Sequence, residues 1–243
     1  MTRIESTTVL ITGANRGIGQ ALVDEALARG AATVYAGTRT PLDHPDPRVR
    51  PVTLDVTSSE QIKAAVDGIG SLDLLINNAG IAGYDDLSDP AVIAQHLAVN
   101  LYGTLAVTRA FTPLLARSGG AIVNNLSVNA FAPLPLIASY SVSKAAAFSA
   151  TQSLRTLLSA QGVSVHAVLT GIVDTDMSRG VEIPKDTPAA VAAAILDGVE
   201  KGEDDIFPDA MSRPMADSWR TGAGKALEGQ YAALTADTPA GAR

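Results

Sequence analysis

Short aliphatic runs alternate with longer segments of helical periodicity along most of this chain, and this alternation limits the fold more than any other feature. The runs TVLIT, LLIN, AIVN and VSVHAVL are almost continuously apolar, as parallel strands buried on both faces are. Repeated units of one strand and one helix bring successive strands into a single parallel sheet. The sequence therefore predicts an α/β fold with a doubly wound, mainly parallel, seven-stranded sheet flanked by helices.

The expected elements follow from these two periods. We expect strands at 8–12, 33–38, 52–55, 72–77, 121–125, 163–169 and 205–207. We expect helices at about 17–29, 59–69, 90–116 and 139–161, another after Thr187 and Pro188, and an accessory helix at about 216–234. No Gly/Ser/Pro-rich linker divides the 243 residues. We therefore expect one domain, with a substrate loop and accessory helices at about 178–234 and a flexible tail at about 235–243.

Charge and composition argue against several partners and sites. The net charge of -7 disfavours nucleic acid and an anionic membrane, so we expect neither as a partner. The uncharged stretch 118–143 is long enough to cross a membrane, but two prolines and three asparagines interrupt it, and we interpret it as a buried strand and a loop. The chain has no cysteine, and His44, His96 and His166 lie far apart, so we expect no metal site.

The segment TGANRGIG connects the first expected strand to the first expected helix. Gly13, Gly17 and Gly19 permit a tight turn and close approach of a pyrophosphate, whose charge the amides at a helix N-terminus stabilise. A glycine-rich turn alone is a weak signal, because many turns between a strand and a helix carry glycine. Its place at the start of the chain makes it a candidate dinucleotide site.

The spacing TGxxxGxG resembles the fingerprint of the short-chain dehydrogenase/reductase family. Further motifs follow in the order typical of that family: Asp55 and Val56 after the third strand, NNAG at 77–80, Asn100 in AVNLYG, Ser127 in IVNNLSV, and the pair Tyr140 and Lys144 in YxxxK. The resemblance spans about 9–177 and implies a Rossmann-type fold with a nicotinamide cofactor. It implies cofactor contacts from Gly13, Asn15, Arg16, Gly17, Ile18, Gly19, Thr38, Arg39, Asp55, Val56, Asn78, Ala79, Gly80, Tyr140, Lys144, Gly171, Ile172 and Thr175.

The end of the second strand indicates which cofactor is preferred. An acidic residue there would bind the adenosine ribose of NAD(H), but this chain has Thr38 followed by Arg39. Arg39 can pair with a 2′-phosphate, and Arg16 supplies a second cation, although Arg16 alone is equally typical of a solvated surface charge. Together these residues predict NADP(H).

Tyr140 and Lys144 are four residues apart, so they share one face of the expected helix. A free tyrosine has a pKa of roughly 10, and a nearby ammonium together with a cationic nicotinamide favours the phenolate. We therefore expect Tyr140 to exchange a proton with the substrate oxygen. The resemblance implies that Lys144 also binds the nicotinamide ribose, that Ser127 holds the substrate oxygen, and that Asn100 holds a water that relays protons to Lys144.

Two positions depart from the family's usual pattern. Thr170 replaces the proline that commonly precedes glycine after the sixth strand, which relaxes the turn against the nicotinamide, and Leu126 replaces a serine. We expect cofactor binding to survive both changes.

The segment after Ser127 is almost wholly apolar and is expected to shape the substrate site. The candidate pocket residues are Val128, Phe131, Leu134, Ile137 and Met177. They favour a hydrophobic or aryl ketone, although the alternative is that several simply pack against the core. Glycine and polar residues at 178–186 indicate a mobile lid.

These features predict an NADP-dependent oxidoreductase that interconverts a ketone and a secondary alcohol. A 3-ketoacyl carrier protein reductase would share every motif, but it needs a basic dock that the net charge does not support. A non-catalytic NADP(H)-sensing regulator would typically lack the tyrosine or the lysine. The resemblance further implies a homotetramer, with a dimer as the alternative, formed by the helices at 90–116 and 139–161 and the final strand. The absence of cysteine fits a cytoplasmic location.

Overall fold

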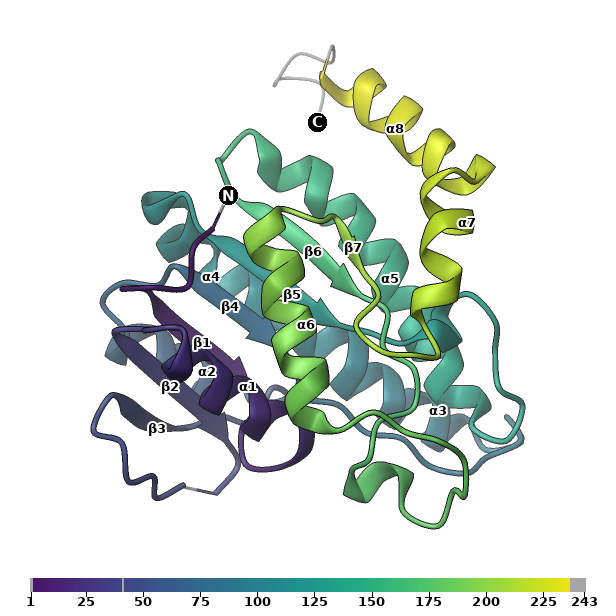
Figure 1. Ribbon diagram of the computed structural model, residues 1–243, viewed down its shortest axis with the longest axis horizontal. Helices are drawn as coiled ribbons and strands as arrows, with labels where there is room; N and C mark the ends of the chain where they lie inside the picture. The colour runs from purple at the N-terminus through teal and green to yellow at the C-terminus, as the bar shows by residue number, and fades with distance from the viewer. Residues whose placement is uncertain (1, 41, 237–243) are drawn as a thin grey trace.

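A computed structural model describes residues 2–40 and 42–236 of the chain. Its described part contains a seven-stranded sheet in the order β3-β2-β1-β4-β5-β6-β7, in which every neighbouring pair is parallel (Figure 1). The strands are β1 (Thr8–Thr12), β2 (Thr33–Thr38), β3 (Val49–Thr53), β4 (Leu74–Asn77), β5 (Ala121–Asn125), β6 (Ser164–Val168) and β7 (Asp205–Ile206). The predicted doubly wound α/β fold is confirmed. The strand order reverses between β1 and β4, and a ligand crevice is expected at the carboxyl ends of the strands at such a point.

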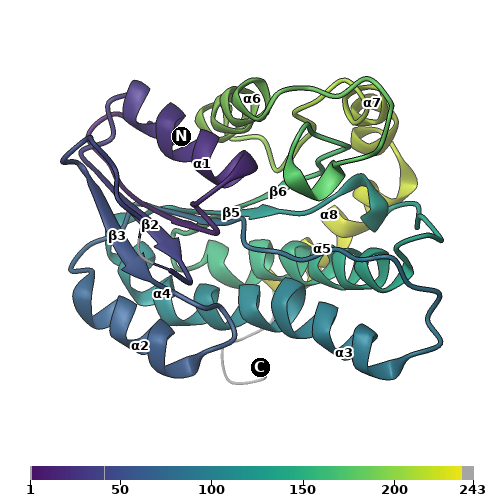
Figure 2. The ribbon, with the colours of Figure 1, turned by 90° about the horizontal axis from the view of Figure 1, so that it is seen from below.

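Helices cover both faces of the sheet (Figure 2). They are α1 (Gly17–Ala28), α2 (Ser59–Gly68), α3 (Pro90–Leu97), α4 (Thr104–Ser118), α5 (Ala138–Ser159), α6 (Pro188–Lys201), α7 (Ala216–Arg220) and α8 (Ala223–Ala236). One face carries α1 and α6, and the other carries α2, α4 and α5. The apolar residues of the inner strands β1, β4 and β5 are therefore buried on both sides, which explains their almost continuous apolar runs.

The predicted bounds of the third strand, 52–55, are wrong. β3 begins at Val49, which is paired with Val34 of β2, and ends at Thr53. Its sequence VRPVT contains a proline and an exposed arginine, which an edge strand tolerates because one side of its backbone has no partner strand. A search for a continuous apolar run misses such a strand.

The expected helix at 90–116 consists of three parts. α3 continues into a π-helical segment, Ala98–Gly103, which then continues into α4. A π-helical turn widens the backbone locally, occurs often at functional sites, and leaves no signature in the apolar periodicity. This segment carries Asn100, which is 2% exposed and thus turned into the protein.

The helical stretch Pro90–Ser118 is long and apolar enough to cross a membrane by length and composition, with a mean hydropathy of 1.2 over its most apolar 18-residue window. In this fold α3 contacts α5, and α4 contacts β4 and α2. The α4 part of the stretch therefore lies against the sheet, with Val107, Phe111 and Leu115 fully buried, although only 28% of the apolar window is buried within the protein.

The expected accessory helix is divided into α7 and α8, and an ion-pair cluster attaches α8 to the body. Arg155 of α5 donates a hydrogen bond of 2.8 Å to Asp205 and also pairs with Glu228 of α8, while Lys225 lies 2.7 Å from Asp205. α8 extends to Ala236, so the first two positions of the tail predicted at 235–243 are helical. The remainder of that prediction lies outside the described residues.

Candidate active site

The loop after β1 is shaped to receive a phosphate group. Gly13 has a φ of +66°, and a side chain at Gly19 would overlap the carbonyl oxygen of Gly13. α1 begins at Gly17, and no side chain within the described part of the chain caps its N-terminus at Arg16. Its first amides are therefore open to an anion, as a pyrophosphate site requires.

Two predicted cofactor residues of this loop, Asn15 and Arg16, are exposed, and Ile18 packs against the core between β1 and α1. The Arg16 guanidinium lies 3.5 Å from the carboxylate of Asp176, in the loop after β6. The pair is largely exposed, so solvent weakens it and Arg16 stays available for a stronger anion.

The end of β2 carries no carboxylate. The Thr38 side chain is buried and its hydroxyl donates to the carbonyl oxygen of Thr40, while Arg39 is exposed. Hydrogen bonds from Thr57 lower the pKa of Asp55, and the positive charge of Arg39 lowers it further. Arg39 therefore lies near Asp55 at the end where the adenosine is expected. Val56 packs beneath the π-helical segment, where a side chain on Gly103 would lie 2.7 Å from it.

The NNAG segment joins the glycine loop to the catalytic residues. The Asn78 amide donates to the carbonyl oxygens of Thr12 and Gly13 at 3.1 and 3.2 Å, and the Ala79 amide donates to the Thr12 hydroxyl at 3.0 Å. A side chain on Gly80 would lie 3.2 Å from Oδ1 of Asn100 and 3.8 Å from Nζ of Lys144. Glycine at this position therefore leaves space beside the lysine.

Tyr140 and Lys144 lie on the first turns of α5, and the lysine nitrogen is 5.5 Å from the centre of the tyrosine ring. Lys144 is 6% exposed and donates a 2.8 Å hydrogen bond to the carbonyl oxygen of Asn125 at the end of β5. Burial lowers the pKa of Lys144 to about 8. The lysine therefore still carries most of its charge at neutral pH but loses it more readily than an exposed lysine does.

Ser127 is positioned beside Tyr140 by the turn that follows β5. The side chain of Ser127 is buried, and its Oγ accepts a 3.1 Å hydrogen bond from the amide of Asn129. Burial raises the pKa of the Tyr140 phenol, and a hydrogen bond with Ser127 acts in the opposite direction. Burial is thus the largest effect on the pKa of the phenol here, and the expected effect of the ammonium together with a bound cationic nicotinamide stays a prediction.

The side chain of Asn100 forms hydrogen bonds with the backbone of Ile81, directly after the NNAG segment. Its Oδ1 accepts from the amide of Ile81, and its Nδ2 donates to the carbonyl oxygen of Ile81 and to the hydroxyl of Ser143, all at 2.9 Å. The structure thus brings Asn100 close to Gly80 and Lys144. The role of Asn100 as the holder of a relay water stays a prediction.

The segment after β6 folds back over the glycine loop. A side chain at Gly17 would lie 3.1 Å from the methyl group of Thr175, and the half-buried Ile172 lies between this contact and β6. The Gly171 amide donates a 2.7 Å hydrogen bond to Asp209, which is almost fully buried. Thr175 therefore lies beside the glycine loop, and the cofactor contacts of Gly171, Ile172 and Thr175 stay predictions.

The five predicted pocket residues fall into two groups. Val128 and Phe131 pack against the core, where the Phe131 ring stacks on Trp219 with centroids 4.7 Å apart. Leu134 and Met177 are exposed, at 44% and 57%. Ile137 is half-buried at the start of α5. The exposed pair is thus free to meet a ligand, whereas Phe131 is largely engaged by other aromatic rings.

Three residues that hold parts of the site in place were not predicted from the sequence. Asp85 binds the first turn of α5, Asp209 binds Gly171, and Asn125 binds Lys144. The asparagine doublet at the end of β5 is a detectable signal, because polar residues at the carboxyl end of a buried strand face the crevice. Neither aspartate had such a signal.

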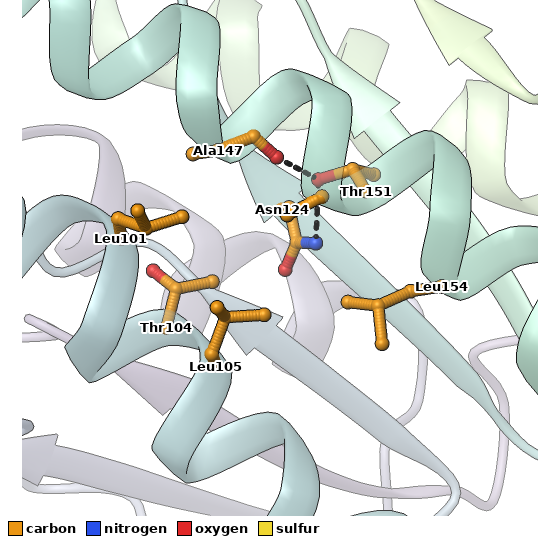
Figure 3. Close-up of a pocket in the computed structure, with 8 residues that line it drawn as sticks. Leu101, Thr104, Leu105, Asn124, Ala147, Thr151 and Leu154 are labelled. Carbon is orange, nitrogen blue, oxygen red and sulfur yellow. Dashed lines mark hydrogen bonds between the residues drawn. The ribbon is translucent and has the colours of Figure 1, made fainter.

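A shallow depression with no room for a buried water molecule lies apart from these residues, between α4, α5 and β5 (Figure 3). Its wall is mainly apolar, with the Asn124 amide donating to Thr151 at 3.0 Å. None of the four predicted catalytic residues lines it. Within the described part of the chain, no group of three His, Asp or Glu side chains gathers as a metal site would require.

The sequence and the fold both have relatives among known proteins. The profile of the short chain dehydrogenase family matches residues 7–185. An uncharacterised oxidoreductase of Staphylococcus epidermidis is 34% identical over 197 residues, which cover 75% of this chain and 84% of that protein. A short chain dehydrogenase of Monascus purpureus is 34% identical over 203 residues, covering 74% and 69%.

Solved structures agree with this assignment. The crystal structure of a short chain dehydrogenase from Burkholderia cenocepacia in complex with NADP is 40% identical, with a TM-score of 0.84 and coverage of 94% of this chain and 98% of that one. A 3-ketoacyl-(acyl-carrier-protein) reductase from Brucella melitensis complexed with NADH is 24% identical with a TM-score of 0.76, covering 84% and 96%, and it shares the fold. From its glycine loop to its YxxxK pair, this chain belongs to the short-chain dehydrogenase/reductase family of oxidoreductases.

Proposed function

We propose that the protein is an NADP(H)-dependent oxidoreductase that interconverts ketones and secondary alcohols. The observation that carries this proposal is the cluster of Ser127, Tyr140 and Lys144 beside the glycine loop. Two hydroxyl groups that share a hydrogen bond and a buried ammonium group next to them form a site that can hold an oxygen atom and exchange a proton with it.

Several protein groups support the choice of cofactor. The glycine loop and the open N-terminus of α1 fit a pyrophosphate, and Thr38 leaves the end of β2 without a carboxylate that would repel a 2′-phosphate. Arg39 and Arg16 are exposed cations at this end of the crevice. The structure from Burkholderia cenocepacia, which is 40% identical to this chain, was determined with NADP.

Each group at the site has a separate role in the proposed reaction. When bound, NADPH supplies the hydride that reaches the carbonyl carbon. Ser127 holds the substrate oxygen, and Tyr140 donates its phenolic proton to that oxygen in reduction or accepts a proton in oxidation. The raised pKa of Tyr140 keeps the phenol protonated near neutrality, which suits reduction. Lys144 stays charged beside the ring and binds the nicotinamide ribose.

Exposed apolar side chains in the loops after three neighbouring strands support a hydrophobic or aryl ketone as the substrate. Tyr84, Leu136 and Ile183 are exposed in the loops that follow β4, β5 and β6, at 80%, 63% and 43%, together with Leu134 and Met177. Large apolar groups left in water on neighbouring loops are typical of a binding surface for an apolar ligand.

We also propose a cytoplasmic homotetramer, with a dimer as the alternative. Val142 and Leu157 on α5 are 43% and 54% exposed, which supports a role for this helix in subunit contacts. Size-exclusion chromatography with light scattering measures the number of subunits directly.

The test of the proposed reaction is the loss of nicotinamide absorbance when the protein is mixed with NADPH and a panel of aliphatic, aryl and acyl-thioester ketones. We expect turnover of hydrophobic or aryl ketones, none with Tyr140→Phe, and nearly unchanged NADPH binding by that variant. Tyr231→Phe, at an exposed site on α8, is the matched control. Binding of NADPH without turnover on any ketone would favour the non-catalytic regulator, and a preference for acyl thioesters would favour the carrier-protein reductase.

A further inference from the structure

A chain of side-chain hydrogen bonds crosses the carboxyl edge of the sheet from β6 to β1. The Thr170 hydroxyl donates to Oδ1 of Asn125 at 2.7 Å, and Nδ2 of Asn125 donates to Oδ1 of Asn78 at 2.9 Å. Asn78 in turn donates to the carbonyl oxygens of Thr12 and Gly13. The chain therefore ties the turn after β6 to the glycine loop after β1.

The direction of these hydrogen bonds is the same at every step. Each asparagine accepts through its oxygen from the β6 side and donates through its nitrogen toward β1. Turning the Asn125 amide by half a turn would face its oxygen with Oδ1 of Asn78, and turning the Asn78 amide would face its nitrogen with Nδ2 of Asn125. Thr170 is 5% exposed, and polar groups in such a buried network are costly to leave without partners.

Asn125 also contacts the catalytic lysine. Its backbone carbonyl accepts the 2.8 Å hydrogen bond from Nζ of Lys144, while its side chain binds Thr170 and Asn78. One residue at the end of β5 thus fixes the lysine and both neighbouring strand ends. Within the described residues, this is the one hydrogen bond that the lysine nitrogen donates.

We infer that Asn125 is a positioning residue, and that its hydrogen bond from Thr170 holds the turn at 170–171 in place of the proline ring that the family commonly has there. Proline stiffens a turn by fixing φ, whereas a side-chain hydrogen bond to the next strand restrains the turn from outside. Gly171 is then held from two sides, by Thr170 through Asn125 and by Asp209 through its own amide.

This arrangement sets the spacing between two loops that bind one ligand. The glycine loop lies at the β1 end of the chain of hydrogen bonds, and the turn at 170–171 lies at its β6 end. A cofactor that contacts both loops needs them held at one distance, because ordering a loose loop costs binding free energy. The inference rests on the proposed use of NADP(H), and its test measures NADPH binding directly.

The experiment compares NADPH dissociation constants, by nicotinamide fluorescence, for the wild type, Thr170→Val, Asn125→Leu and the double variants Asn125→Leu/Thr170→Val and Asn125→Leu/Thr170→Pro. We expect Thr170→Val to weaken binding about fivefold, the equilibrium effect of one neutral hydrogen bond. Asn125→Leu is expected to weaken it more, with no further loss on adding Thr170→Val, because one interaction is removed by either change. Thr170→Pro in the Asn125→Leu background is expected to restore part of the affinity.

Thr108→Val is the matched control. Thr108, on α4, is also buried, and its hydroxyl accepts a 2.9 Å hydrogen bond from the side-chain amide of Asn77, so the same chemical group is removed outside the chain of hydrogen bonds from Thr170 to Gly13. We expect it to lower Tm and leave NADPH binding unchanged. Equal affinity of Thr170→Val and the wild type, or independent effects of the Thr170 and Asn125 changes, would overturn the inference alone. A wild type that binds no NADPH would instead overturn the proposed function.

Discussion

The carboxylate of Asp85 binds the backbone and the side chain of Ser139, although 54 positions separate the two residues. Both carboxylate oxygens accept from the Ser139 amide at 3.1 Å, and Oδ1 accepts from its hydroxyl at 2.6 Å. α5 begins at Ala138, and Ile137 before it supplies no capping side chain. Asp85, in the loop after β4, therefore caps the N-terminus of α5 at Ser139, which is the residue before Tyr140.

Replacing Asp85 with asparagine should disturb Tyr140 through the start of α5. We expect Asp85→Asn to lower kcat by roughly threefold to tenfold, because an amide can accept only part of these hydrogen bonds and carries no charge for the helix N-terminus. Steady-state kinetics at saturating NADPH measures the change. Asp86→Asn, next to it, is the control, since Asp86 accepts from the amide of Ser88 in its own loop and, among the described residues, makes no contact with α5.

The same contact has a defined dependence on pH. The hydrogen bond from the Ser139 hydroxyl lowers the pKa of Asp85 below its ordinary value. Its contribution to stability is therefore full above the pKa of an unfolded aspartate, about 3.9, and is lost as the pH falls through the lower folded pKa. We expect Tm of the wild type and of Asp85→Asn to converge as the pH falls below about 4. A constant difference in Tm down to strongly acidic pH would contradict this assignment.

Lys144 should make the protein more stable at alkaline pH than at neutral pH. Its pKa is about 8 in the folded protein and about 10.4 in an unfolded chain, so the unfolded state binds more protons between these values. The free energy of unfolding then rises with pH in this window. Compared with Lys144→Met, the wild type should gain on the order of 2 kcal/mol between pH 7 and pH 9.5.

Denaturant titrations of both proteins at the two pH values measure this gain. The window ends below pH 10 because Tyr140, with its raised pKa, has the opposite effect above it. Lys63→Met is the control for loss of one positive charge, since Lys63 is exposed on α2 and paired with Asp67. A gain of the same size for the wild type over Lys63→Met would show that Lys144 is not its source.

The preference for NADPH should depend on Arg39. We expect Arg39→Ala to reduce kcat/KM for NADPH by about tenfold, as loss of a charge-assisted contact to a phosphate would, and to leave kcat/KM for NADH nearly unchanged. NADH is the internal control, because it differs from NADPH only in the 2′-phosphate. A matching loss with both cofactors would place Arg39 outside the phosphate site.

Arg16 offers a second test of the same preference. The Asp176 carboxylate lies 3.5 Å from its guanidinium and competes with a phosphate for it. Asp176→Asn should therefore tighten NADPH binding by roughly twofold to fivefold, within the range of exposed ion pairs, without affecting NADH. Fluorescence titration with the two cofactors measures both constants, and unchanged NADPH binding would assign Arg16 to the surface.

The strands and the order of the motifs were predictable because they depend on local patterns. A strand buried on both faces must be apolar throughout, and this made β1, β4 and β5 predictable. β3 lies at the edge of the sheet, where that requirement does not apply, and its predicted bounds were therefore wrong. The contact of Asp85 with Ser139 depends on how two distant loops meet, and no local pattern records it. The same holds for Asp209 and Gly171.

Phe131 and Leu134 separate the two interpretations of the apolar segment after Ser127. Phe131 meets Phe148 edge to face at 5.1 Å and stacks on Trp219, so Phe131→Ala should lower the free energy of unfolding by about 2–3 kcal/mol. Leu134 is 44% exposed, and Leu134→Ala should change stability by less than about 0.5 kcal/mol. Leu134→Ala is instead expected to raise KM for hydrophobic ketones several-fold with kcat unchanged, because it removes contact area that the substrate and the transition state share.

Chemical denaturation and steady-state kinetics of the two variants measure these opposite profiles. Leu227→Ala, at an exposed leucine of α8 that is 43% accessible, controls for removing the same side chain away from the crevice. If Leu134→Ala leaves KM for every hydrophobic ketone unchanged while Phe131→Ala raises it in folded protein, the substrate contacts the aromatic cluster and not the exposed rim. The pocket would then extend beneath α7, where Trp219 lies against Phe131.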